Sequence, residues 1–156
     1  MNSTAVIAKM TGAPVAVRSS RERLDLQRRS WADNKLFSDL MNATADIIIV
    51  LNAGQQTVFA SKSLRTITGE EPVIGLRFGE IFKCRHAFMT EHECGSTPEC
   101  ATCGGQQAIS AGREGRTENR ECRILTSSSQ AFEMQVTVLP GSTGGDAFLV
   151  CIFHDV

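Results

Sequence analysis

Two apolar stretches near the C-terminus constrain the fold more than any other part of the sequence. "AFEMQVTVL" (131–139) alternates apolar and polar residues, which is the pattern of an antiparallel strand with one buried face. "AFLVCIFH" (147–154) is apolar at both odd and even positions, which predicts a central strand with two buried faces. Two such strands in succession indicate a domain built around an antiparallel sheet.

The rest of the chain supplies partners for these strands. "DIIIVLN" and "QTVFAS" predict a hairpin over 45–61, and "TENRECRIL" predicts a further, weaker strand. The segment between them contains short helical pieces punctuated by glycine and proline. The order of two strands, several short helices and three strands predicts an α+β domain, with a five-stranded antiparallel sheet and short helices on one face.

The N-terminal part of the chain predicts a helix over 19–41. Ser19 and Glu22 have the spacing of a capping box, and apolar residues then recur at helical intervals. These apolar residues are Leu24, Trp31, Leu36, Phe37, Leu40 and Met41. Such a stripe either packs against the domain or forms a dimer seam, and the sequence leaves both open. Residues 1–18 lack periodicity and are predicted to be a flexible tail.

Composition limits the class of protein. The chain has 156 residues, of which 42% are hydrophobic, so one domain can bury a core without disulfides or metal. No apolar run approaches the roughly 20 residues of a membrane helix, and the N-terminus has no secretory signal, so we expect a cytoplasmic protein with reduced cysteines. The N-terminal segment is basic, with Arg21, Arg23, Arg28 and Arg29 as candidates for nucleic-acid contacts. A solvated helix face is the simpler interpretation, and we expect no nucleic-acid partner.

The stretch "KCRHAFMTEHECGSTPECATCGG" (83–105) contains Cys84, Cys94, Cys100 and Cys103. Two cysteines separated by two residues, as in "CATC", can direct both sulfurs to one metal ion, and four thiolates form a closed tetrahedral site. Reduced cysteines at this density favour metal binding or redox chemistry over a disulfide framework. We therefore predict that these four cysteines bind a metal, with His86 and His92 as substitute ligands.

The metal and its role stay open at this point. Structural zinc is the first interpretation, and an iron–sulfur cluster, which also takes four cysteines, is the second and would make the chain an oxygen, redox or iron sensor. A metal-free switch would instead use a disulfide between Cys100 and Cys103, or the cysteines would simply pack as small apolar residues. Cys122 and Cys151 lie on predicted strands and are expected in the core, with a distal ligand or redox partner as their alternative role.

From "LFSDLMNATADIIIVLNAGQQTVFASKSLRTITGEEPVIGLRFGEIF" to the closing "FHDV", the order of motifs over 36–156 resembles a PAS domain. The resemblance implies a sensory domain over 42–156, with a Cys-rich segment at 84–104 and a helix at 19–41 that serves signalling or dimerisation. Asp155 and Val156 resemble the junction to an output module. The resemblance also implies a homodimer, the sensor part of a bacterial two-component histidine kinase, with that kinase as partner and no catalysis in this chain.

Cofactors known in PAS domains can be compared residue by residue. The flavin-binding subfamily carries Asn-Cys-Arg-Phe-Leu-Gln, whereas here Lys83 precedes Cys84-Arg85, His86-Ala87 follow, and the closing strand has no Gln. A haem-binding PAS domain has a histidine on the helix before the third strand, and residues 101–112 contain none. Both comparisons disfavour flavin and haem.

The competing functional class is a small thiol-redox or electron-transfer protein that uses the CxxC, but this motif does not follow the strand of a thioredoxin-like unit.

Overall fold

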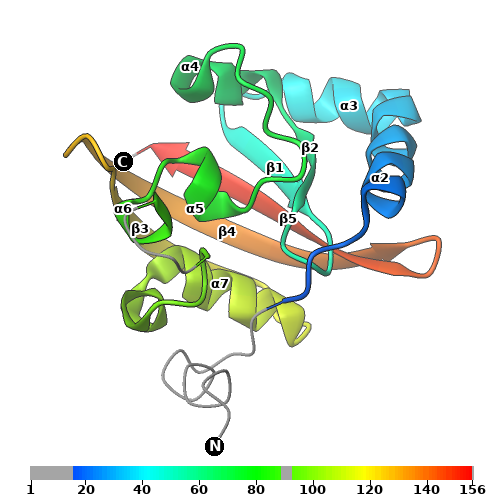
Figure 1. Ribbon diagram of the computed structural model, residues 1–156. Helices are drawn as coiled ribbons and strands as arrows, with labels where there is room; N and C mark the ends of the chain where they lie inside the picture. The colour runs from blue at the N-terminus through cyan, green and yellow to red at the C-terminus, as the bar shows by residue number, and fades with distance from the viewer. Residues whose placement is uncertain (1–15, 89–92, 156) are drawn as a thin grey trace, which may run out of the picture.

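The computed structural model describes residues 16–88 and 93–155, so most of the predicted tail, His92 and Val156 lie outside the described residues. Five strands form one antiparallel sheet in the order β2-β1-β5-β4-β3 (Figure 1). The strands are β1 (Ile47–Leu51), β2 (Thr57–Ala60), β3 (Glu118–Leu125), β4 (Ala131–Thr143) and β5 (Asp146–Asp155). The stretch with two apolar faces is the central strand β5, and the predicted α+β class with a five-stranded sheet is confirmed.

Alternation along the central strands creates two separate cores. Ile49 and Leu51 of β1 belong to a large cluster on one face of the sheet, whereas Val50 between them belongs to a smaller cluster on the other. On β5, Cys151 and Phe153 join the large cluster and Phe148 joins the small one. Successive side chains of a strand point to opposite faces, so a run of apolar residues must be covered from both sides.

Short helices cover the face that carries the large core (Figure 1). They are η1 (Lys62–Leu64), α4 (Arg65–Thr68), α5 (Phe78–Ile81), α6 (Arg85–Phe88), η2 (Pro98–Thr102) and α7 (Gly104–Arg113). The rings of Phe78 and Phe82, from α5 and its C-cap, lie 5.2 Å and 5.3 Å from the ring of Phe153. This aromatic packing fixes α5 over the centre of the sheet.

The predicted helix over 19–41 is two helices, α2 (Arg21–Asp33) and α3 (Lys35–Asn42). Asn34 between them has φ −81° and ψ 88°, outside the helical region, and its side chain accepts a hydrogen bond from the backbone N–H of Phe37 at 3.1 Å. Asn34 therefore ends one helix and caps the next. At the start of α2 the capping side chain is Ser20 rather than Ser19, since its Oγ accepts from the N–H of Arg23 at 3.3 Å.

Helices α2 and α3 lie on the opposite face, over the small core. Their inward side chains pack against Val50, Val58, Phe59 and Phe148, and these side chains are Leu24, Trp31, Phe37 and Met41. Leu36 and Leu40 of the same apolar stripe are 72% and 57% exposed.

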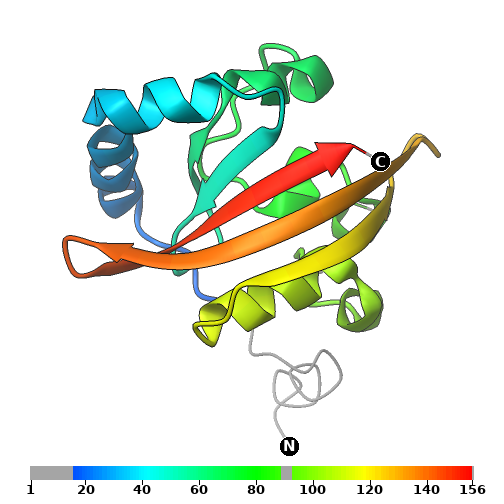
Figure 2. The same cartoon turned by 180° about the vertical axis from the view of Figure 1, so that it is seen from behind.

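Viewed from behind, the outer faces of β3 and β4 carry no helix from the described residues (Figure 2). Within the described part of the chain, no helix has the length and apolarity needed to cross a membrane.

Candidate functional site

All four cysteines of the predicted metal set line one cavity of about 450 Å³. Cys84 follows α5, Cys94 lies in the loop after α6, Cys100 is on η2, and Cys103 directly precedes α7. The side chain of His86, on α6, also lines the cavity. The fold therefore brings together residues that are up to nineteen positions apart, on the helical side of the sheet.

Gly79 of α5 holds the first two cysteines. Its carbonyl accepts a hydrogen bond from the N–H of Cys84 at 2.7 Å, and its own N–H donates to Sγ of Cys94 at 3.2 Å. A Cβ at position 79 would lie 2.7 Å from that sulfur, so only glycine leaves room for it. Cys84 is also fixed from the other side by a β-bridge to Thr126, after β3.

The two cysteines of the CxxC have different partners. Sγ of Cys100 lies 3.3 Å from the donating N–H of Gly95 and 3.1 Å from Oγ1 of Thr97. Cys103 is the N-cap residue of α7, where its side chain makes no capping hydrogen bond, and it lines a hollow together with Cys122 of β3. The two thiols therefore have different surroundings, although their spacing in the sequence predicts that they act as one pair.

Hydrogen bonding and burial move the pKa values of the thiols in opposite directions. The neighbouring thiol of Cys122, together with the N–H groups at the start of α7, lowers the pKa of Cys103. Removal from water raises the pKa of Cys84, and raises that of Cys94 to about 12. The neighbouring Cys103 thiol and burial raise the pKa of Cys122.

Gln106 is a further polar group in the cavity wall. The residue is only 6% exposed, and its Oε1 has no hydrogen-bond partner among the described residues. A buried acceptor without a partner loses about 1–3 kcal/mol relative to a satisfied one, so an occupant that donates a hydrogen bond would be favoured here. In residues 16–88 and 93–155, no three His, Cys, Asp or Glu side chains form a group that could hold one metal ion. The four-cysteine metal set stays a prediction.

Solved structures share this architecture. The PAS domain of an HTR-like protein from Haloarcula marismortui aligns with a TM-score of 0.54 at 16% identity, over 80% of this chain and 98% of that one. The PAS domain of nitrogen regulation protein NR(II) from Vibrio parahaemolyticus gives 0.53 at 12% identity, over 78% and 98%. A PAS domain from Colwellia psychrerythraea gives 0.55 at 17% identity, over 78% and 95%. This chain has the PAS fold. No family model and no curated protein matches the sequence itself.

In this PAS fold a cluster of charged residues joins the loop that contains Cys94 to the N-terminal segment. The side chain of Arg77, at the N-cap of α5, is 2% exposed; it donates to the carbonyls of Ala16 and Gly54 and, at 2.9 Å, to Oε2 of Glu93. The other carboxylate oxygen of Glu93 accepts from Nε of Arg18 at 2.8 Å. Glu80 in turn pairs with Arg18. We call the four charged residues Arg18, Arg77, Glu80 and Glu93 the Arg77 cluster.

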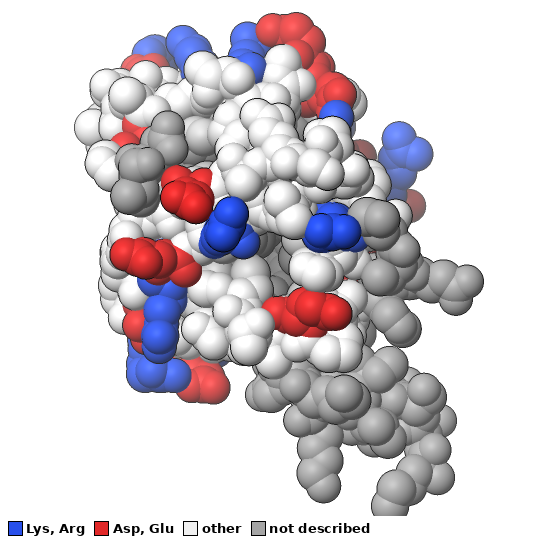
Figure 3. Space-filling model, turned by 90° about the vertical axis from the view of Figure 1, so that its left-hand side faces the viewer, with Lys and Arg blue, Asp and Glu red and all other residues white. Residues whose placement is uncertain are grey.

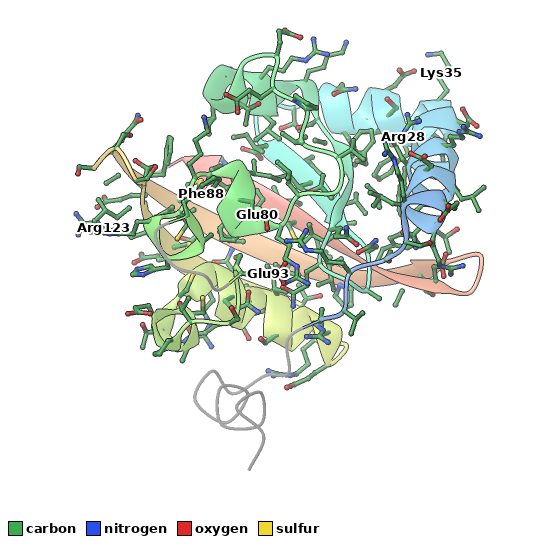
Figure 4. All side chains as sticks on the ribbon, in the orientation of Figure 1. Arg28, Lys35, Glu80, Phe88, Glu93 and Arg123 are labelled. Carbon is green, nitrogen blue, oxygen red and sulfur yellow. The ribbon has the colours of Figure 1, made fainter. Side chains whose placement is uncertain are left out.

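The Arg77 cluster spans three separate segments of the chain. Figure 4 shows Glu80 on α5 and Glu93 beside the segment that leads into α2. The hydrogen bond from Arg18 is the main reason that the pKa of Glu93 is lowered. Sequence reasoning missed this cluster, because Arg77 and Glu93 carry no motif and resemble ordinary surface charges until the fold buries one of them.

The outer surface over α6 carries charges of both signs. Figure 3 shows Lys and Arg side chains interspersed with Asp and Glu on this side of the molecule.

Of the four arginines considered for nucleic-acid contacts, Arg23 forms an ion pair with Asp146 and Arg28 lies 3.8 Å from Asp25. The basic residues of α2 thus serve in part to hold the helix against the β4–β5 hairpin.

Proposed function

We propose that this PAS domain is a sensory module of a bacterial two-component histidine kinase, located in the cytoplasm, and that its cysteine-lined cavity is the sensing element. One observation carries the proposal: Cys84, Cys94, Cys100 and Cys103 line the same cavity on the helical side of the PAS sheet. The chain performs no catalysis in this proposal. Its output is a change of conformation that a linked kinase reads.

The same four cysteines are the proposed metal ligands, with zinc favoured and an iron–sulfur cluster next. The N–H groups of Gly79 and Gly95 donate to the sulfurs of Cys94 and Cys100, and such bonds orient ligands and stabilise the thiolate form. Zinc would supply a structural crosslink of this irregular loop, whereas a cluster would supply an oxidisable centre. Thiols with raised pKa values must lose their protons on binding, so metal uptake releases protons.

The Arg77 cluster is the proposed route from the cavity to the N-terminal helices. Glu93 directly precedes Cys94 and is bonded to Arg18, which lies two residues before the N-cap Ser20 of α2. A displacement of Cys94 is therefore passed through Glu93 to the start of α2. For this to signal, the two states of the cavity must differ in their preference for the arrangement of α2 by a few kcal/mol.

Metal analysis and an absorption spectrum on protein purified without oxygen test the proposal. A variant with Ser at Cys94, Cys100 and Cys103 removes three ligands, and Cys151→Val, in the sheet core, is the matched control. We expect metal in the wild-type protein and in the control but not in the triple variant. Zinc without visible colour assigns a structural role, and iron with sulfide assigns a cluster. Equal metal content in the wild-type protein and the triple variant would disprove the site.

The competing function, a thiol oxidoreductase that uses Cys100 and Cys103, has weaker support. The thiol of Cys100 is hydrogen-bonded to Gly95 and Thr97, whereas Cys103 lies at the N-cap of α7 and shares a hollow with Cys122. A disulfide-reductase assay on the wild-type protein and on a Cys100→Ser variant separates the two functions. Activity that disappears in the variant would favour the oxidoreductase.

A further inference from the structure

The start of α7 approaches β3 so closely that side chains cannot fit between them. A Cβ on Gly104 would lie 1.8 Å from the carbonyl oxygen of Glu121, far inside van der Waals contact. A Cβ on Gly105 would lie 2.5 Å from the ring of Phe78 and 3.3 Å from Sγ of Cys122. The two glycines that follow the CxxC therefore allow the backbone of α7 to lie directly on the strand.

This approach brings together two thiols that are far apart in the sequence. Cys103 immediately precedes the glycines, and Cys122 immediately follows Glu121 on β3, so the contact between the two backbones places both cysteines in the wall of one hollow. Cys100 takes no part in this contact, because its sulfur is turned toward Gly95 and Thr97. Of the described cysteines, Cys122 is the one that shares this hollow with Cys103, and it lies on the sheet, outside the cysteine-rich segment.

Small molecules can reach Cys103 from two sides and Cys122 from one. Cys103 is half-buried and lines both the cysteine cavity and a second hollow of about 450 Å³. Cys122 is 2% exposed but also lines the second hollow, beside Glu133 and Met134 of β4. Cys103 is thus the thiol that a dissolved oxidant meets first, and Cys122 is the neighbour positioned to resolve the product.

We propose that Cys103 and Cys122 form a reversible disulfide when the protein meets a peroxide. One thiol sulfur attacks the peroxide, the O–O bond breaks, and a sulfenic acid and water form. The second thiol then attacks the sulfenic sulfur, the S–S bond forms, and a second water leaves. Two thiols are oxidised and hydrogen peroxide is reduced to two molecules of water. A low-molecular-weight dithiol reverses the reaction by thiol–disulfide exchange.

The disulfide and the four-cysteine metal site exclude each other, because both require the sulfur of Cys103. Oxidation would therefore remove one of four proposed ligands, and a bound metal would protect Cys103. The disulfide itself does not depend on the metal proposal. A chain that binds no metal under any condition can still form this bond, and a metal-binding chain can fail to form it.

Disulfide mapping by mass spectrometry tests the proposal. The full chain, stripped of metal by a chelator and reduced, is treated with hydrogen peroxide, alkylated, digested without reduction and analysed with fragmentation of the crosslinked peptides. We expect a crosslink between Cys103 and Cys122 that a dithiol removes. A Cys100→Ser variant should form it as the wild-type protein does, and Cys122→Ala should lose it.

A crosslink between Cys100 and Cys103, or oxidation of Cys103 to sulfinic acid without any crosslink, would overturn the proposal. The wild-type map decides this without any variant, so a folding defect of Cys122→Ala does not affect the result. The same mapping on metal-loaded protein separates the two proposals. If Cys103 is protected from oxidation only in the metal-loaded form, the result supports both the metal site and the disulfide. A mapped disulfide in a chain that never binds metal supports the disulfide alone.

Discussion

Gly104 fixes the distance between α7 and β3, because any side chain there would meet the carbonyl oxygen of Glu121. We expect Gly104→Ala to lower the free energy of unfolding by about 2–3 kcal/mol or more, since the clash is with backbone and only movement of the whole helix relieves it. Gly141→Ala, on β4, is the matched control, because a Cβ there would have no atom of the described residues within 4 Å beyond its chain neighbours. Urea unfolding compares the variants, and equal stabilities would contradict the proposed contact.

The Cys151 thiol makes the free energy of unfolding depend on pH in the alkaline range. Its thiol is fully enclosed on β5, between Ile49 and Val138, and burial raises its pKa to about 12. The unfolded chain releases this proton near pH 9 while the folded chain keeps it, so the stabilisation is complete below pH 9 and is lost as pH rises toward 12.

A Cys151→Val variant removes this dependence while keeping an apolar side chain of similar size. Between about pH 7.5 and pH 10 the wild-type protein should lose about 1.4 kcal/mol more of its unfolding free energy than the variant, which is the value of one pH unit of differential protonation. Denaturant unfolding at both pH values under reducing conditions measures the difference. Parallel losses in the two proteins would show that the thiol also titrates in the folded state.

At the residue scale, sequence reasoning found the cysteines of 84–103 but not their neighbours. Their density within one stretch identified them, and the fold does bring all four to one cavity. Cys122 was expected in the core, where it lies, but its contact with Cys103 arises from the close approach at Gly104 and Gly105. Spacing along the chain carries no information about such a contact.

At the scale of elements, periodicity predicted the strands well because each strand has a buried face. The alternation in 131–139 and the continuous apolar run in 147–154 correspond to β4 and β5, and the hairpin over 45–61 corresponds to β1 and β2. The helix over 19–41 was predicted without its break, because Asn34 is tolerated inside a helix and its side chain becomes a cap only once α3 turns onto the sheet. Local pattern gives the element, and tertiary packing decides where it bends.

Arg77 connects three segments of the chain to α5, and replacing it should destabilise the contacts of all three. Arg77→Lys keeps the charge but loses the planar group that reaches Ala16, Gly54 and Glu93 together, so we expect a loss of about 2–4 kcal/mol of unfolding free energy. Amide hydrogen exchange should become faster at 16–20 and 93–97. Arg116→Lys is the control, because that side chain is 61% exposed although it also pairs with glutamates. Faster exchange confined to α5 would show that the cluster does not couple the segments.

At the scale of the whole molecule, the sheet separates the proposed sensing element from the proposed output. The cysteine cavity lies over the large core, whereas α2 and α3 lie over the small core on the other face. A signal can pass through the sheet or around its edge, and the Arg77 cluster provides the second route because Arg18 lies two residues before the N-cap of α2. This arrangement requires α2 and α3 to have a partner surface that reads their position.

Leu36 and Leu40 supply such a surface, since they lie one turn apart on α3 and are 72% and 57% exposed. The homodimer that the resemblance to PAS domains implies would bury them, because exposed leucines at this spacing form an apolar stripe that a second copy can cover. A double variant with Glu at both positions should shift the protein from dimer to monomer in sedimentation velocity with little loss of stability. Leu139→Glu on β4, where the leucine is 36% exposed, should leave the dimer intact. A wild-type protein that sediments as a monomer at all concentrations, or a double variant that remains dimeric, would exclude α3 as the dimer interface and leave the stripe to another partner.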